Sequence, residues 1–492
     1  TINNAQTYLC HYHLTLDGNL SILAGTLNTQ NSGGVDNNLT VAGHVTNNGT
    51  LTLNGSTVNL GSTSTEAGDF QGSGTFNLDT STINYHTAGG ANFVPSTSAN
   101  FDTNTSTLNL IGLNGSNRAH NFTFASGNMH NITTSRGAGT DTHTDTLNGN
   151  CTITGNLTVG ANSNFSTGSR VFTVNGDVDV TGQLISNGSD KPMSFGSLTI
   201  NSGGTYSATS GTTTIVNKAS SNFAFKNSGT FTHNSGTMQI GDGSTSTGGA
   251  HLMNTTYHNL IINRDQNAPD GNTPWRPSSG SEVTIAGDLT VTKGRFYRNN
   301  SSNSLVVTGD VLIEANGQVG TEAASGSNTF GSLSVASGGT YLATSGTTTI
   351  NGDPGGYPNL GINLDGTFTH NNGTLKYTGG SGALDLSGTG NLYNFDHATT
   401  GTTFIVNNTT IENNLTMTLG NFQGANGNEN LTVKGNVTID SVGQTMNFVG
   451  TSEHTFGFLT ILNGTYKVQN DTGGFTKVGG IRNVGGTVSN AV

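Results

Sequence analysis

Acidic side chains at alternate positions are the first residues in this sequence that could do chemistry. Asp177 and Asp179 alternate on a predicted strand and would project from one face of it. Asp141, His143 and Asp145 are spaced in the same way. Paired carboxylates serve as general acid and base in polysaccharide cleavage, or bind calcium, usually with a Lys or Arg nearby. Neither group has a basic neighbour close in sequence, so we interpret both as solvated surface and predict no catalytic residue.

Histidines are the next candidates, as metal ligands. His11 and His13 flank Tyr12 and would place two imidazoles on one strand face, where a trimer could hold iron, nickel or zinc. His233 and His370 recur within the same repeated phrase, which favours a stacking role instead. Zinc-type Cys/His spacing, calcium-loop motifs and phosphate loops are absent from the sequence. We therefore expect no metal and no other cofactor.

One segment breaks the rhythm of the chain and is our candidate contact site. Residues 263–282 hold three of the seven prolines, the only tryptophan, Trp275, and the arginines Arg264 and Arg276. Proline cannot donate to a sheet ladder, so this segment is predicted to loop out of the sheet. The three named side chains would then contact a glycan or protein on a host surface. Alternatively, Trp275 folds back and covers a hydrophobic patch.

Long internal repeats organise the elements that carry these residues. Residues 195–215 read FGSLTINSGGTYSATSGTTTI, residues 330–350 repeat the phrase with few changes, and a weaker copy begins at Phe456. A second phrase, of the type ITGNLTV, begins at Leu16, Ile153, Ile285 and Ile411, in steps of 137, 132 and 126 residues. Fixed-period self-similarity is typical of repeat architectures. We divide the chain into repeats 1–150, 151–282 (ending in the proline-rich loop), 283–410 and 411–492, the last truncated and Gly-rich at its end.

Composition and periodicity give the fold class. Charged residues make up 9% of the 492 residues, against about 25% in ordinary soluble domains. Apolar residues alternate with Thr, Ser and Asn, which predicts short strands at 171–174, 177–180, 183–186, 197–200, 205–208 and 212–216. Evenly spread strands, and Asn recurring at turns where stacked coils form Asn ladders, favour a parallel β-helix (β-solenoid) over an antiparallel meander. At three short strands per coil we expect about 22 coils.

Net charge and the length of the apolar runs restrict the kinds of partner that the chain could bind. The formal net charge is −12 with no basic cluster, so we expect no nucleic-acid partner. No apolar run approaches the about 20 residues of a membrane-spanning helix, so we expect no membrane insertion.

Cys10 and Cys151 lie far apart in the sequence, which places them in distant coils of a solenoid. A disulfide between them is therefore not expected, because it needs Cα atoms within about 7 Å.

The phrases NLTV, GTFTHNxGT and SGGTYSATSGTTTI resemble those of large repetitive proteins of marine phages. They are also similar to bacterial surface adhesins of the filamentous-haemagglutinin and autotransporter kind. The resemblance covers residues 14–466 and implies a right-handed parallel β-helix that serves as a virion fibre or spike, or as a cell-surface stalk. It supplies no catalytic residue.

These observations predict a non-enzymatic structural rod at a virion surface or in another extracellular place. Open solenoid ends expose unpaired strands, so we expect self-association through the ends or pairing with other structural subunits. The alternatives are a bacterial adhesin stalk or secreted filament subunit, and a polysaccharide-cleaving β-helix enzyme.

Overall fold

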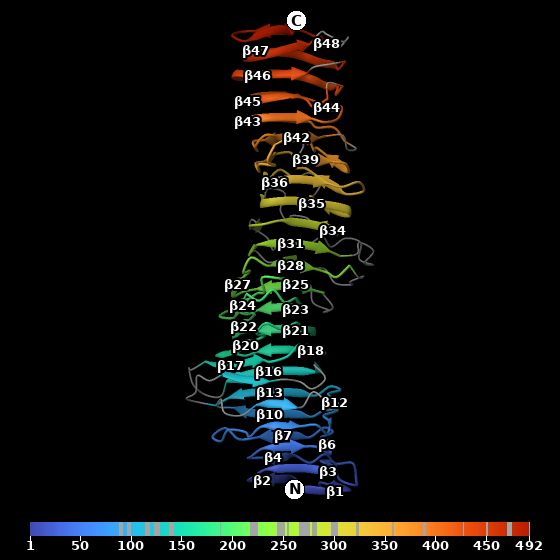
Figure 1. Cartoon of the computed structure of the whole chain (residues 1–492), viewed down its shortest axis with the longest axis vertical. Helices are drawn as coiled ribbons and strands as arrows, with labels where there is room; N and C mark the ends of the chain where they lie inside the picture. The colour runs from blue at the N-terminus through green and yellow to red at the C-terminus, as the bar shows by residue number, and fades with distance from the viewer. Residues whose placement is uncertain are drawn as a thin grey trace. The chain divides into compact units, whose positions relative to one another are not determined.

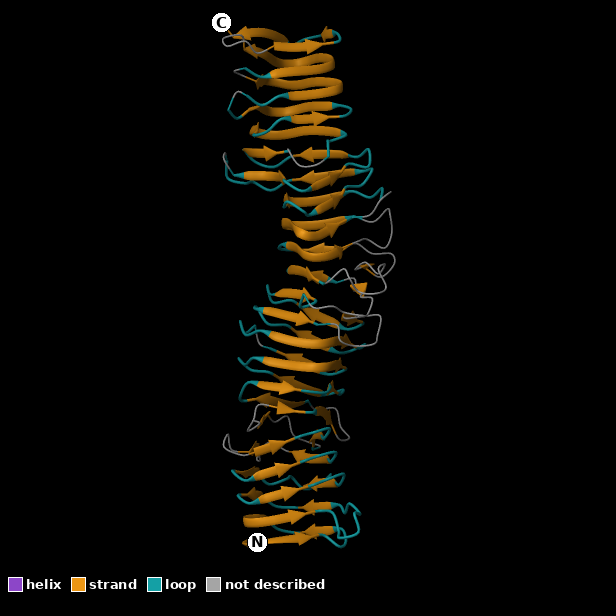
Figure 2. Cartoon of the chain, turned by 90° about the vertical axis from the view of Figure 1, so that its right-hand side faces the viewer, coloured by secondary structure: helices purple, strands orange, loops and turns teal. Residues whose placement is uncertain are grey.

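The computed structural model describes residues 1–87, 92–95, 100–113, 119–122, 128–136, 142–186, 188–216, 225–243, 251–252, 255–264, 276–277, 283–296, 304–320, 324–356, 359–386, 390–426, 428–448, 451–469 and 475–491. The chain forms two compact units, Thr1–Gln239 (unit 1) and Ile240–Val492 (unit 2). Strands and loops make up the described residues, and no helix occurs among them (Figure 2).

Each unit is a parallel β-solenoid, which confirms the predicted fold class and excludes a meander of hairpins. Within each unit the strands stack in chain order (Figure 1). In unit 2, β34 (Leu289–Phe296), β35 (Leu305–Val319) and β36 (Asn328–Val335) lie side by side and run in the same direction. Leu289 pairs with Val311 and Val311 with Leu333, which gives the regular coil length of about 22 residues.

The described residues make about 18 turns, fewer than the number of coils expected. The difference arises because some coils are longer than the about 22 residues of the regular ones. Leu14 pairs with Leu39 in unit 1, and Leu333 pairs with Ile362 in unit 2, so both of these coils exceed the regular length. Extra residues in turns lengthen a coil without adding a winding.

The predicted strands of the second repeat are confirmed. They correspond to β21 (Phe172–Val180), β22 (Gln183–Ile185), β23 (Met193–Ile200), β24 (Thr205–Ser207) and β25 (Thr212–Ile215). β21 joins two predicted strands, and its register with β23 shifts between Val174 and Asp177. The backbone can therefore keep the strand conformation where the chain turns a corner of the coil. The same happens near the C-terminal end, where β46 (Leu431–Phe448) and β47 (Glu453–Gln469) pair along most of a coil.

The repeated phrase builds the same interior twice. Tyr206 and Tyr341 occupy equivalent positions, and both side chains are fully buried. The Tyr206 hydroxyl bonds Thr213 Oγ1 at 2.8 Å, and the Tyr341 hydroxyl bonds the equivalent Thr348 Oγ1 at 3.0 Å. Each tyrosine ring also meets a phenylalanine from the start of the phrase with centroids 6.0 Å apart, nearly edge to face. The repetition in the sequence is thus reproduced as the same hydroxyl contact and the same edge-to-face ring contact.

Side-chain ladders tie successive coils together at one turn, as the recurring Asn residues predicted. In unit 1, Asn131 Oδ1 accepts the Asn156 backbone N–H at 2.8 Å, and Asn156 Oδ1 accepts the Asp177 N–H at 2.8 Å. The Ser197 hydroxyl then donates to Asp177 Oδ1 at 2.6 Å. We call this set of four residues the Asx ladder of unit 1.

Unit 2 repeats the arrangement with its own Asx ladder. Asn259 accepts from the Asp288 N–H and Asp288 from the Asp310 N–H, both at 2.9 Å, and Ser332 donates to Asp310 at 2.7 Å. The ladder prediction is thus confirmed, with aspartate and serine as further members. The links in which Asn131, Asn156, Asn259 and Asp288 accept each satisfy a backbone N–H of the next coil. The last link of each ladder satisfies a serine hydroxyl instead.

Candidate functional site

Asp177 and Asp179, the outward carboxylates of β21, have a basic neighbour that is distant in the sequence and is brought close by the stacking of coils. Asp179 is exposed and pairs in register with Thr199, which in turn pairs with Lys226 on β26 (Phe225–Asn227). Partial burial, and then the nearby Asp177, raise the pKa of Asp179, while Lys226 opposes the shift. Both carboxylates face outward, as the sequence analysis interpreted them. The lysine comes from two coils further on, so sequence proximity could not have found it.

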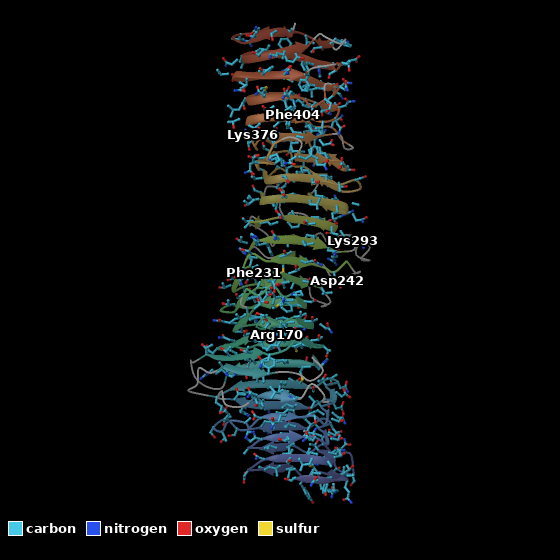
Figure 3. The ribbon with its side chains drawn as sticks, in the orientation of Figure 1. Arg170, Phe231, Asp242, Lys293, Lys376 and Phe404 are labelled. Carbon is cyan, nitrogen blue, oxygen red and sulfur yellow. The ribbon has the colours of Figure 1, made fainter. Side chains whose placement is uncertain are left out.

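A similar lysine–carboxylate arrangement occurs in unit 2. Lys376, labelled in Figure 3, lies on β41 (Thr374–Tyr377) and its Nζ is 3.0 Å from a carboxylate oxygen of Asp396 on the next coil. Both side chains remain partly exposed, at 37% and 24%. Ion pairs of this kind contribute about 0–1 kcal/mol to stability. Their chemistry is that of a hydrated surface.

The interpretation of His143 and Asp145 as solvated surface is wrong. Both side chains are fully buried on β17 (His143–Leu147), and His143 Nε2 lies 2.8 Å from Asp145 Oδ1. The Thr87 hydroxyl is 3.4 Å from the same nitrogen. Asp145 pairs in register with Phe165, whose ring is buried in the next coil, so this strand face points into the solenoid. Asp141, the third member of that group, lies outside the described residues.

The two N-terminal histidines do not share a strand face, contrary to prediction. His11, Tyr12 and His13 form an exposed bend between β1 (Ile2–Leu9) and β2 (Leu14–Leu16). His13 Nδ1 accepts the Asn38 backbone N–H at 2.9 Å, which is a ladder contact to the next coil. The bend arises because the chain turns a corner there, which the strand periodicity did not reveal.

His233 and His370 have matching local roles. Each Nδ1 accepts the backbone N–H two residues ahead, at 3.0 and 2.9 Å, and so fixes a tight turn. His370 also stacks on Tyr393 with ring centroids 5.3 Å apart. The stacking expected for this position is thus confirmed for His370.

Of the predicted contact residues, only Arg264 has a described side chain. It is 4% exposed and its backbone N–H donates to the Lys293 carbonyl at 3.0 Å, so it lies within the coil, directly after β31 (Asn259–Asn263). The backbone of Arg276 pairs with His251 in a two-residue ladder of β29 (His251–Leu252) and β32 (Arg276–Pro277). Trp275 and the Arg276 side chain lie outside the described residues, so the contact hypothesis stays a prediction.

Cysteines and metal ligands offer little further chemistry. Cys10 and Cys151 are both free and buried, and burial raises the pKa of the Cys151 thiol to about 12. No cluster of three or more His, Cys, Asp or Glu side chains suited to a metal ion occurs in the described part of the chain. Nor does any helix there have the length and apolar character needed to cross a bilayer.

The last described coil presents an uncovered apolar face, and we take this as the candidate functional site. It consists of β48 (Phe475–Val478), β49 (Ile481–Asn483) and β50 (Thr487–Ala491), which pair with β47. Ile481 and Val488 are 52% and 41% exposed, whereas their register partners Leu459 and Tyr466 are each 1% exposed. The difference arises because no described coil covers them. We call Ile481 and Val488 the end-coil patch.

The first coil of unit 1 is also open. A pocket of about 450 Å³ lies there, and apolar side chains dominate its lining, among them Ile2, Leu9, Tyr12, Leu14, Leu20 and Leu27. Leu9 is 38% exposed and Tyr12 is 84% exposed. The sequence analysis predicted open ends but did not name the residues that form them.

The residues of the last coil could have been identified from the repeat spacing. Ile481 and Val488 each lie one regular coil length after a buried residue, Leu459 and Tyr466 respectively.

No protein-family model, curated protein or solved structure matches the chain. Its geometry alone therefore defines its class: a β-solenoid repeat protein.

Proposed function

We propose that this protein is a non-enzymatic structural element of a virion appendage, such as a tail fibre or spike, and that copies associate through their terminal coils. The observation that carries the proposal is the end-coil patch, where inward-type apolar side chains stand uncovered. Contiguous exposed apolar surface in a water-soluble protein marks an interaction site. The open strand edges beside it supply main-chain hydrogen bonds to a further coil.

The geometry favours a second copy of the chain as the occupant. The first coil of unit 1 offers an apolar pocket and one unpaired edge of β1, because β1 pairs only with β3 (Leu20–Asn28) among the described strands. A contact between two different faces is heterologous and can propagate into a filament. The resemblance to phage fibre proteins favours a virion location, with a bacterial adhesin stalk as the alternative.

The test is sedimentation velocity over a range of protein concentrations, with the double variant Ile481→Asp/Val488→Asp. Wild type should form larger species as concentration rises, and the variant should remain monomeric. Val442→Asp is the matched control, because Val442 is 78% exposed but lies outside the end-coil patch. Wild type that stays monomeric at every concentration would refute the association. Immunogold microscopy of virions and of cells then distinguishes a fibre from an adhesin stalk.

A polysaccharide-cleaving enzyme is the second candidate, and the raised pKa of Asp179 beside Asp177 and Lys226 is the observation that favours it. A carboxyl with a raised pKa is suited to general acid catalysis. We expect no turnover of a panel of acidic polysaccharides. Turnover that disappears in Asp179→Asn, but persists in Asp17→Asn, would instead support the enzyme.

A further inference from the structure

Eight outward side chains of unit 1 form a regular two-column array. The strands are β7 (Thr57–Leu60), β10 (Thr82–Thr87), β13 (Thr107–Gly112) and β16 (Asn131–Arg136), paired in parallel without a register shift. On β13 and β16 the third outward position holds Ile111 and Ser135. The first two outward positions of all four strands are threonine or asparagine. We call them the Thr/Asn array: Thr57, Thr82, Thr107 and Asn131 in one column, and Asn59, Asn84, Asn109 and Thr133 in the other.

All eight side chains are partly exposed, and the residues between them are buried. Val58, Ile83, Leu108 and Ile132 separate the two columns and are at most 1% exposed. The alternation fixes the array to the outer face of the sheet, over a packed interior. The sheet itself sets the spacing, at about 4.8 Å between strands and about 6.6 Å between alternate residues on one strand.

Hydrogen bonds within the array hold its side chains in place. Asn84 Nδ2 donates to Asn59 Oδ1 and Asn109 Nδ2 donates to Asn84 Oδ1, both at 2.9 Å. Asn131 Nδ2 donates to Thr107 Oγ1 at 3.3 Å. Threonine is restricted at χ1 by its branched Cβ. The polar groups are therefore repeated at fixed positions before any ligand arrives.

The chemistry of the array fits ordered water. Each asparagine has two amide N–H groups and two acceptor lone pairs, so the column bonds leave donors and acceptors directed outward. Each threonine adds a hydroxyl and a methyl group. The array carries no charge, and the same columns continue through uncharged Asn156 and Thr158 before reaching Asp177 and Asp179.

We propose that the Thr/Asn array binds the surface of ice. Holding one water costs up to about 2 kcal/mol of entropy, and a rigid array whose donors and acceptors repeat in two directions holds many waters in one lattice. The hydrogen-bonding groups of an ice surface repeat in two directions, as those of the array do. A sugar chain is disfavoured because the array lacks the aromatic side chains that commonly line small-ligand sites. This inference is independent of association through the end coils.

The experiment measures ice recrystallisation inhibition and ice-crystal shaping by the purified chain. Thr82→Tyr places a bulky ring in the centre of one column, and Asn84→Tyr does so in the other. Thr46→Tyr is the matched control, because Thr46 is an equally half-exposed threonine on β5 (Val45–Asn47), in the other sheet of the same unit. Thermal melts establish that all variants remain folded.

Wild type and Thr46→Tyr should inhibit recrystallisation, and each array variant should need about tenfold more protein or more for the same effect. Wild type without activity would overturn the proposal. So would activity lost equally in the array variants and in Thr46→Tyr, or activity unchanged in all three. Retention on insoluble crystalline polysaccharide without any ice activity would replace ice with a carbohydrate lattice and would likewise overturn it.

Discussion

At the scale of single residues, the described part of unit 2 buries two imidazoles in neutral form. His397 is fully buried, with Nδ1 donating to the Leu419 carbonyl at 2.9 Å and Nε2 accepting from the Thr403 hydroxyl at 2.6 Å. His454 is 3% exposed, and its Nδ1 accepts the Leu431 backbone N–H at 3.2 Å. Burial lowers the pKa of each imidazole from 6.5 to about 4. Both rings are therefore neutral parts of the core at pH 7.

Acid should destabilise unit 2 through these histidines. The unfolded chain binds their protons at higher pH than the folded one, so the stability they contribute is complete above pH 6.5 and is lost as pH falls towards about 4. A shift of this size corresponds to about 3 kcal/mol for each imidazole. Urea unfolding of wild type between pH 7 and pH 4 should show the loss, and His397→Gln should show a smaller one. His11→Gln, at an exposed bend, should follow wild type; equal pH slopes in all three proteins would contradict the assignment.

Tyr206 and Tyr341, the buried tyrosines of the repeated phrase, give a second residue-scale prediction. Tyr206→Phe removes one hydroxyl contact and leaves the buried Thr213 hydroxyl without it. An unmade buried hydrogen bond costs about 1–3 kcal/mol. Tyr341→Phe should cost more, because Tyr341 also accepts from Asn328 Nδ2 at 2.7 Å. Equilibrium unfolding in urea measures both, with Tyr12→Phe (84% exposed) as an unchanged control. Equal stability of all three variants would mean that these hydroxyls contribute nothing.

At the scale of elements, successive coils are joined both by paired strands and by Asx ladders. Strands pair along the flat faces, and the ladders carry hydrogen bonding across a turn between them. The order Asn, Asn or Asp, Asp and Ser recurs in both units. Because each Asn or Asp accepts from the coil that follows, the ladder also specifies which turns come into register.

Removing one ladder member tests that role. Asn156→Ala deprives the Asp177 backbone N–H of its acceptor, and we expect a loss of about 1 kcal/mol in the free energy of unfolding. Asn175→Ala is the control, because Asn175 is also exposed but lies outside the ladder. Chemical denaturation of both variants provides the measurement. An equally large loss in the free energy of unfolding of Asn175→Ala would show that the effect does not depend on membership of the ladder.

Strand positions could be predicted from the sequence because alternation and repeated phrases report directly on which side chains face inward. The buried pair of His143 and Asp145 was missed because polarity was given more weight than position. Leu147 has the same parity on the strand and is buried with them, so the inward face could have been recognised. Lys226 could not have been placed beside Asp179, because coil lengths vary with the turns between strands.

At the scale of the whole molecule, each unit is built by coils stacking on coils. Each unit has an interior only because neighbouring windings cover one another, as expected of solenoid repeats. The end-coil patch is the place where this covering stops among the described residues. Association between copies would continue the same packing, with parallel strands and inward apolar side chains across the junction.

Cryo-electron microscopy of wild-type protein at concentrations that favour association tests this claim most directly. We predict assemblies in which parallel strands about 4.8 Å apart continue from the coil of β48–β50 into the first coil of the next copy. Ile481 and Val488 should be buried at that junction. Junctions formed through the sides of the units, with the end-coil patch still open to solvent, would show that the copies do not associate through their terminal coils.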